Sequence, residues 1–406
     1  MRYLLLTFAV VLPTLLRAQG GSNYSTIGIG DFRPAIGALY DGASSYGIAL
    51  PSTYTISTVN PALWTFVQTT RLQGGYRFHQ QLITAGVGRR AQNNGKVEGL
   101  ITLFAIDTAQ GWSLSWGFYP LTSVNAAIAV PVAVPLPEEH LKGNYRFLTT
   151  GGISTMHLGL ATRLTPSIGA GVAIRYHFGL FQTERTTTFQ DSWTAPDTLT
   201  VTDWISGANL LLGIWYRPTP NWLFAASLTT PTTFTTDQIW RYAFVNTYGD
   251  STIERSLRWR LPATFGFGIA YQWNRMSVAA EGFYADFQNL NYRLPTGTEF
   301  QALYRASLSL RREARAGGSR SYWNQLGLSA GVSWQRLYYR TAGHPISEAA
   351  LSAGMSLPLG SAAILDIACQ SGIRGKRAPR LVQEWFGRFT FTLSIGERWF
   401  IPSRRR

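Results

Sequence analysis

The chain has 406 residues, of which only 14% are charged, against about 25% in ordinary soluble domains. Aromatic residues also reach 14%, with 14 Trp and 19 Tyr, the residues that lie at lipid–water boundaries. The formal charge of +15 comes almost wholly from arginine, but no basic run is interleaved with stacking aromatic residues. The composition therefore argues against a nucleic-acid-binding protein, and its arginines suit lipid and lipopolysaccharide phosphates instead.

The first residues have the pattern of a secretory signal. Arg2 precedes an apolar run from residue 3 to 16, and Ala18 offers a small residue before a cut at Gln19. As a membrane helix this run is too short, and Pro13 interrupts it. We find no other apolar run of helix-spanning length, so a membrane location would depend on strands. The single Cys369 excludes an intramolecular disulfide and lies far from the signal, so no lipid-anchored N-terminus is indicated.

The segment from residue 19 to 70 does not alternate cleanly and is rich in Gly, Ser, Thr and Pro. It nevertheless keeps apolar residues, among them Ile27, Phe32, Leu39 and Trp64, which a disordered leader would lack. We therefore expect this segment to pack inside another part of the protein.

From Arg71 onward the chain reads as strands, identified by period-two alternation and by turn residues between them. The pattern predicts fourteen strands, which run from Arg71 to Val87, Val97 to Asp107, Gly111 to about Val132, Ile153 to Leu164, Ile168 to Phe181, Asp203 to Arg217, Asn221 to Thr230, Ser256 to Trp273, Met276 to Phe287, Glu299 to Ala314, Tyr322 to Tyr339, Ile346 to Pro358, Ala362 to Ile373 and Trp385 to Phe400.

The connections between these strands sort by length. Those after even-numbered strands are short and those after odd-numbered strands are mostly longer, as in a barrel with periplasmic turns and outer loops. A soluble sandwich has no reason to obey this rule. We expect the loops around residues 89–90, 138–146, 191–202 and 237–250 to face the cell exterior.

Each strand separates an apolar face from a polar one. The expected lipid-facing residues are Val172, Ile174, Tyr176, Phe178, Leu210, Leu212, Ile214, Tyr216, Phe265, Phe267, Ile269, Tyr271, Leu326, Leu328, Ala330, Val332 and Trp334. The expected lumen side holds Arg175, His177, Gln272, Arg305, Ser307, Ser309, Arg311, Gln325 and Ser329.

The last strand alternates in the same way and ends in Trp399 and Phe400. Phe389, Phe391 and Leu393 fall on one face and polar residues on the other. This ending resembles the terminal signal by which the barrel-assembly machinery recognises outer-membrane barrels, although six residues follow it here.

Two elements of the 19–70 segment resemble the N-terminus of the FadL family of outer-membrane transporters for long-chain fatty acids and other hydrophobic compounds. They are Tyr24 to Asp31 and the Asn60-Pro61-Ala62 element, with a glycine-rich middle around Gly42 between them. Where relatives have paired glycines, this chain has the residues Leu39 to Ala43. Taken alone, Asn60-Pro61 would be a plain turn initiator.

The resemblance implies an all-β protein, a 14-stranded antiparallel transmembrane β-barrel with an N-terminal plug, or hatch. It implies a ligand pocket at the junction of plug and barrel, with arginines offered to a carboxylate. The expected ligand or gate residues are Asn60, Pro61, Ala62, Gly42, Arg175, His177 and Arg305.

No catalytic or metal-binding pattern is evident, and no cofactor is expected. The five histidines lack ligand spacing, and no Gly-x-Ser-x-Gly stretch lies at a strand-to-helix turn. Glu281 and Asp366 fall on the lumen side, where we expect each to pair with an arginine. These observations favour a non-enzymatic protein over a barrel enzyme.

The sequence thus predicts a signal peptide over residues 1–18, a plug over 19–70, a barrel over 71–400 and a basic tail over 401–406. The expected function is uptake of hydrophobic small molecules across the bacterial outer membrane, by a monomer that contacts lipid and lipopolysaccharide. The alternative is a FadL-like barrel that acts as a scaffold in protein secretion or surface assembly.

Overall fold

A computed structural model describes residues 21–33, 35–85, 88–135, 140–190, 197–244, 251–314, 322–378 and 381–399. The predicted signal peptide, the basic tail and Phe400 lie outside these residues. Within the described part of the chain, no helix is both long and apolar enough to cross a membrane.

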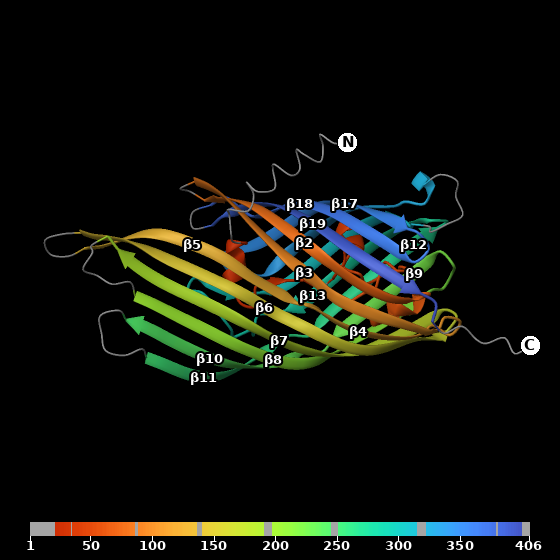
Figure 1. Ribbon diagram of the computed structural model, residues 1–406, viewed down its shortest axis with the longest axis horizontal. Coiled ribbons are helices and arrows are strands. Elements are labelled where there is room, and N and C mark those ends of the chain that lie inside the picture. The colour runs from red at the N-terminus through yellow and green to blue at the C-terminus, as the bar shows by residue number, and fades with distance from the viewer. Residues whose placement is uncertain are drawn as a thin grey trace, which may run out of the picture.

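The chain forms a closed antiparallel barrel (Figure 1). Strands β2 to β19 run along its wall fourteen times, and we call each such run a pass, because some passes are divided into two consecutive strands. The passes are β2 (Thr70–Ala85), β3 (Gly88–Asp107), β4 with β5 (Trp112–Pro120, Thr122–Pro135), β6 (His140–Thr165), β7 (Ile168–Phe189), β8 (Asp197–Tyr216), β9 with β10 (Trp222–Thr229, Thr232–Phe244), β11 with β12 (Ser251–Leu261, Thr264–Trp273), β13 (Met276–Asp286), β14 with β15 (Thr298–Phe300, Ala302–Arg312), β16 (Gly327–Thr341), β17 (His344–Leu359), β18 (Ala363–Gly375) and β19 (Gln383–Glu397). The last strand closes the barrel on the first, from Gln383 opposite Thr84 to Glu397 opposite Thr70.

The two ends of the barrel differ. We call the end that holds Thr70 and Glu397 the turn end, and the opposite end, where β5 and β6 project furthest, the loop end (Figure 1). Several strands reach further towards the loop end than the alternation predicts. Strand β6, for example, begins at His140 rather than at Ile153. Strands that stand in water on both faces have no lipid-facing stripe to reveal them.

The expected alternation of short and long connections is only partly observed. The predicted short connection after the tenth strand is wrong, because the chain runs from residue 313 to 326 and forms the short helix η3 (Tyr322–Asn324) before β16 begins. The loop-end hairpin from β16 to β17 has only Ala342 and Gly343 between its strands.

The alternation correctly predicts the outer face. Ile174 and Phe267 are 61% and 63% exposed towards the lipid, while His177 is 0% exposed on the lumen side. Leu326 is an exception to the predicted lipid face, since it is buried. It precedes the first residue of β16, where no ladder yet sets which side a residue faces.

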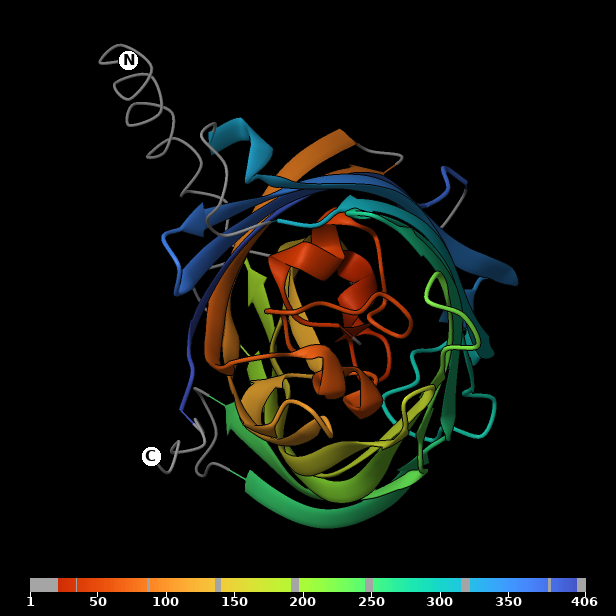
Figure 2. The same ribbon diagram turned by 90° about the vertical axis from the view of Figure 1, so that its right-hand side faces the viewer.

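The N-terminal segment fills the lumen as a plug (Figure 2). Its regular elements are η1 (Asn23–Thr26), β1 (Asp31–Phe32), α2 (Ala38–Gly42) and η2 (Pro61–Phe66). Apolar plug residues such as Ile48 and Leu50 are fully buried. Because these elements are short, the wall supplies most of the contacts that hold them.

Candidate functional site

The Asn60-Pro61-Ala62 element fixes the end of the plug to the wall. The Oδ1 atom of Asn60 accepts a hydrogen bond from the backbone N–H of Ala62 at 3.0 Å and so caps η2. Its amide nitrogen donates to the carbonyl of Ile48 at 2.8 Å. From the wall strand β8, the indole N–H of Trp215 donates to the carbonyl of Ala62 at 3.0 Å. The element is therefore a turn that also attaches the end of the plug to the wall, and we call it the Asn60 anchor.

Two wall glycines make room for this anchor. A Cβ atom on Gly171 of β7 would lie 2.6 Å from the carbonyl carbon of Pro61. A Cβ atom on Gly213 of β8 would overlap the amide oxygen of Asn60 and lie 2.7 Å from Cδ of Pro61. These glycines let the backbone of the plug approach the wall closely.

Glu281 anchors the middle of the plug, which corrects the expectation that it pairs with an arginine. Its carboxylate, on β13, accepts hydrogen bonds from the backbone N–H groups of Tyr46, Ile48 and Ala49 and from the hydroxyl of Ser45. The side chain is buried. A carboxylate with several N–H donors needs no arginine to compensate for its burial.

Gly42 is a packing position at the end of α2. A Cβ atom there would lie 2.7 Å from Cα of Gly354 on β17 and 2.9 Å from Oγ of Ser329 on β16. The carbonyl of Gly42 also accepts a hydrogen bond from Ser352 at 3.0 Å. The structure thus places this predicted site residue at a close contact between plug and wall.

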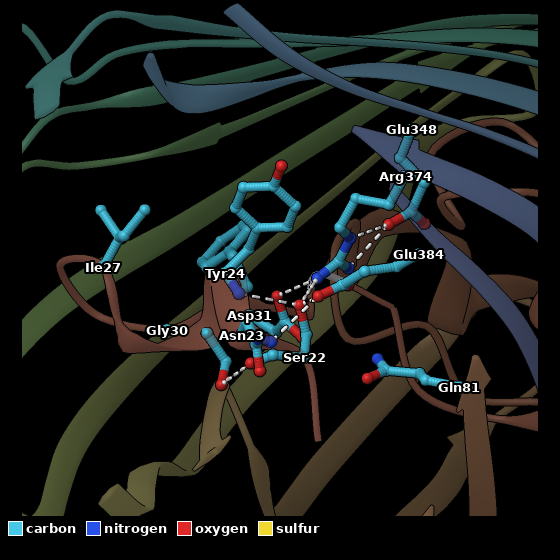
Figure 3. A network of polar contacts seen from close by, with 12 residues as sticks. Ser22, Asn23, Tyr24, Ile27, Gly30, Asp31, Gln81, Glu348, Arg374 and Glu384 are labelled. Carbon is cyan, nitrogen blue, oxygen red and sulfur yellow. Dashed lines mark hydrogen bonds and ion pairs between the residues drawn. The ribbon is translucent and has the colours of Figure 1, made fainter. Parts of the chain in front are cut away.

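A polar network ties the start of the plug to β17, β18 and β19 (Figure 3). Arg374 donates to Glu348 at 2.7 Å, to Asp31 at 2.7 Å and to Ser22 at 2.9 Å. Ser22 in turn donates to Glu384 at 2.6 Å. The contacts to Ser22 and Asp31 join residues that lie far apart in the chain, whereas Arg374 and Glu348 lie opposite each other on neighbouring strands.

A second charged cluster lies beside α2. Arg33 of the plug pairs with Glu98 of β3 and, at 3.1 Å, with Asp41. Arg77 of β2 lies 3.7 Å from Asp41. Burial works to raise the pKa of Asp41, but the guanidinium groups of Arg77 and Arg33 outweigh it and lower the pKa below its ordinary value.

Between the two clusters lies an interior cavity of about 170 Å³. Six basic side chains line it, against three acidic ones: Arg33, Arg77, Lys96, Arg305, Arg374 and Arg388, against Asp31, Asp41 and Glu348. The cavity is therefore cationic, and it is more polar than the apolar pocket that the resemblance implies. A ligand with an acidic group would complement it.

Two of its cations, Lys96 and Arg305, have no carboxylate within ion-pair distance among the described residues. Arg305 donates to the carbonyl of Phe32 at 3.1 Å, and its guanidinium lies 5.2 Å from the centre of that ring. Lys96 donates to the hydroxyl of Ser123 and the carbonyl of Gly151. These two charges remain available to an anionic ligand.

The wall is interrupted next to Lys96. The loop-end half of β3 pairs with β2, and β5 pairs with β6, but no ladder joins that half of β3 to β5 in the described ranges. The plug strand β1 pairs there instead, with Asp31 opposite Ser123. An exterior hollow of about 650 Å³, bordered by Val97, Leu100 and Phe118, lies at this gap.

The hollow and the interior cavity share three lining residues, Lys96, Pro120 and Thr122. The interior cavity and the exterior hollow therefore approach each other at these three residues. We call this place the side gap.

Arg175 and His177 lie away from this cavity. Arg175 donates to Asn209 and to Thr229, both at 2.9 Å. His177 shares a hydrogen bond of 2.8 Å with Thr155. Both side chains are buried in the wall's own polar contacts, whereas Arg305 does line the cavity.

Asp366 is buried on β18 and forms no ion pair among the residues that the structure describes, contrary to the expected pairing with an arginine. Among all the residues that the structure describes, no three His, Cys, Asp or Glu side chains come together in a way that could hold a metal ion.

The network residues Arg374, Glu348 and Glu384, together with Lys96, were not among the predicted site residues. Arg374, Glu348 and Glu384 are buried at inward positions of alternating strands, so alternation marks them as lumen residues. Nothing in the sequence relates Arg374 and Glu384 to the plug, because their partners there are hundreds of residues away. Glu348 joins the network through the wall residues Arg374 and Arg388.

The fold and its plug define a class: a plugged transmembrane β-barrel of the bacterial outer membrane. A model of the BamG family matches residues 1–405, so the chain belongs to the BamG family. A comparison with curated proteins finds no match.

Solved structures share the fold at low sequence identity. A FadL homologue from Pseudomonas aeruginosa has a TM-score of 0.62 at 11% identity, with 92% of this chain and 100% of that chain covered. The CymD monoaromatic hydrocarbon channel has a TM-score of 0.59 at 12% identity, covering 91% and 100%. The toluene transporter TbuX of Ralstonia pickettii has a TM-score of 0.57 at 12% identity, covering 89% and 98%.

Proposed function

We propose that this protein is a non-enzymatic, monomeric outer-membrane channel that takes up hydrophobic small molecules, long-chain fatty acids among them. The observation that carries the proposal is the side gap, where the exterior hollow and the cationic cavity share Lys96, Pro120 and Thr122. An acyl chain suits the apolar border of the hollow, and a carboxylate suits Lys96 and Arg305 inside. The solved channels of the same fold, which carry toluene or other hydrocarbons by name, support this direction.

The experiment obstructs the side gap chemically. In a Cys369→Ser background, Lys96→Cys is modified with a bulky thiol reagent, and uptake of a labelled long-chain fatty acid is measured per folded barrel. We expect the modification to reduce uptake strongly. Lys376→Cys, at an exposed site of the loop end, is the matched control and should be insensitive to the reagent.

Lys96→Glu tests the role of the charge, because it replaces the cation with a group that repels a carboxylate. We expect uptake of the fatty acid to fall, while uptake of an uncharged hydrocarbon falls less. If the unmodified protein takes up neither compound, the channel proposal is wrong. If labelled Lys96→Cys transports normally, the side gap is not the route.

A scaffold function is the second candidate, and a specific observation favours it. The plug is held by Glu281, by the Asn60 anchor and by the Arg374 network, and its core residues are fully buried. A lumen packed in this way suits a rigid scaffold, because a tightly held plug leaves little room for passage. A barrel that carries nothing across a panel of hydrophobic compounds, yet copurifies with a defined partner, would fit this function.

A further inference from the structure

Strand β11 of the barrel has a free edge in the described part of the wall. Strand β11 pairs with β10 along its whole length, from Ser251 opposite Tyr242 to Leu261 opposite Thr232. On its other side no strand pairs with it within the described ranges, because β13 pairs with β12 only as far as Ala285 opposite Thr264. The chain then leaves the wall, and Phe287, Leu290 and Tyr292 are buried inside.

This edge lies beyond the hydrocarbon of the membrane. Strand β12, which continues β11 towards the turn end, has 10 residues (Thr264–Trp273), and about 9 to 11 tilted residues cross the bilayer. Residues 251–258 of β11 are exposed on both faces. A free edge in lipid would leave its backbone groups unpaired, whereas here water reaches them.

The end of this edge nearest the turn end is packed against the barrel interior through Trp259. The Trp259 ring lies between those of Phe234 and Tyr292, each with its centre 4.4 Å away and nearly parallel. The Trp259 indole N–H donates to Thr236 at 2.8 Å, and the Tyr292 hydroxyl donates to Asp203 at 2.6 Å. A pre-ordered strand loses little entropy when another strand adds to it.

The side chains of β11 select the charge of an added strand. Three arginines, Arg255, Arg258 and Arg260, are exposed along it, against the single acid Glu254. A second copy of β11 would place like charges in opposition, which destabilises paired strands. An acidic strand would instead meet opposite charges, and Ile253 and Leu257 offer it exposed apolar contact.

We propose that the free edge of β11 is a docking site for an extended, acidic segment of a partner protein, which adds to the sheet as a further strand next to β11. Backbone hydrogen bonds to the edge provide the binding, and the three arginines provide the selectivity. This site is independent of the side gap and of any transport through it.

The test uses the full chain in nanodiscs and a labelled peptide of about ten alternating Val and Glu residues, close to the 11 residues of β11. Fluorescence anisotropy measures its affinity. Two control peptides accompany it: one with Lys in place of Glu, and one with the same acidic sequence N-methylated at alternate residues, which removes the N–H groups needed for strand addition.

We expect the acidic peptide to bind, and both control peptides to bind at least roughly tenfold more weakly. Arg255→Glu with Arg258→Glu should weaken binding of the acidic peptide to a similar extent. Arg89→Glu with Arg90→Glu, at two exposed positions of the same end, is the matched control and should bind as the unmodified chain does.

Equal binding of the N-methylated peptide would show a purely electrostatic contact and overturn the strand-addition proposal. Preference for the Lys peptide, or no effect of the Arg255 and Arg258 reversal in a folded barrel, would also overturn it. Heat-modifiability of each variant on a gel verifies that the barrel is folded before binding is compared.

Discussion

Single wall residues determine where the plug binds, and Glu281 is the most informative of them. Its buried carboxylate collects three backbone N–H groups and one hydroxyl from residues 45–49. No arginine forms an ion pair with Glu281 among the residues that the structure describes, so its burial is compensated by the plug alone. The plug and the wall are therefore mutually dependent at this position.

Glu281→Gln should loosen the plug without opening the barrel. The amide keeps one acceptor oxygen but turns N–H donors towards the donors of the plug, so we expect a loss of about 2 kcal/mol in the free energy of unfolding. The readout is entry of a small polar antibiotic into cells, together with thermal unfolding of the purified barrel. Glu299→Gln, at an exposed ion pair with Arg340, is the control and should change neither. An unchanged Glu281→Gln barrel would mean that the anchor lies elsewhere.

Gly213 is a second such position, because its missing side chain admits Asn60 and Pro61. Gly213→Ala should cost about 1 to 3 kcal/mol by overpacking and displace the plug end. Gly387→Ala is the matched control, since the nearest atom to its new Cβ is 3.9 Å away. Limited proteolysis of the plug from the turn end compares the two. Equal proteolysis of both variants would contradict the close contact.

At the scale of elements, the plug is a chain of short pieces that the wall orders. Helix η2 has 6 residues and α2 has 5, too few to be stable alone. The anchor at η2 meets β6, β7 and β8, whereas the Arg374 network holds the opposite end of the plug to β17, β18 and β19. The two attachments allow each end to be tested separately.

Asn60→Ala with Pro61→Ala should release the η2 end of the plug while the barrel assembles nearly normally. The variant loses the cap, worth about 1 kcal/mol, and the fixed backbone angle of proline. We expect altered uptake of a labelled fatty acid, or leakage of a polar antibiotic, per heat-modifiable barrel. Pro220→Ala with Asn221→Ala removes the same residue types from an exposed turn and serves as the control. If the variant assembles poorly but each folded molecule has normal flux, the Asn60-Pro61-Ala62 element is only a structural turn.

For the whole molecule, the decisive property is its orientation in the membrane. The closed barrel places both ends of the described wall, Thr70 and Glu397, side by side at the turn end. We expect this end to face the periplasm, so that the side gap and the β11 edge lie towards the exterior.

Single cysteines in a Cys369→Ser background test this orientation on intact cells. Cysteines placed near Arg89, Lys142, Thr198 and Trp240 should react with an impermeant thiol reagent, whereas one at Thr219 should be protected. Labelling at Thr219 with protection of the other four positions would invert the molecule and place the β11 edge in the periplasm.

The sequence by itself determined the number of passes, the two faces of most strands and the presence of an enclosed N-terminal segment. This information is local: lipid on one side and a polar lumen on the other select side chains with a period of two. The alternation is less informative where both faces of a strand have the same environment. It predicts that β11 begins at Ser256, whereas the strand begins at Ser251.

Only the tertiary structure decided which wall residues hold the plug, where the wall is interrupted and that the β11 edge is left free in the described part of the chain. Glu281 and Tyr46 are 235 positions apart, and Arg374 and Ser22 are 352 apart, so no local pattern relates them. The side gap and the β11 edge are places where neighbouring strands do not pair in the described ranges, and this depends on how the neighbouring strands bend and end. Such features arise from closure of the whole barrel, because a strand's own residues do not specify whether its neighbour continues beside it.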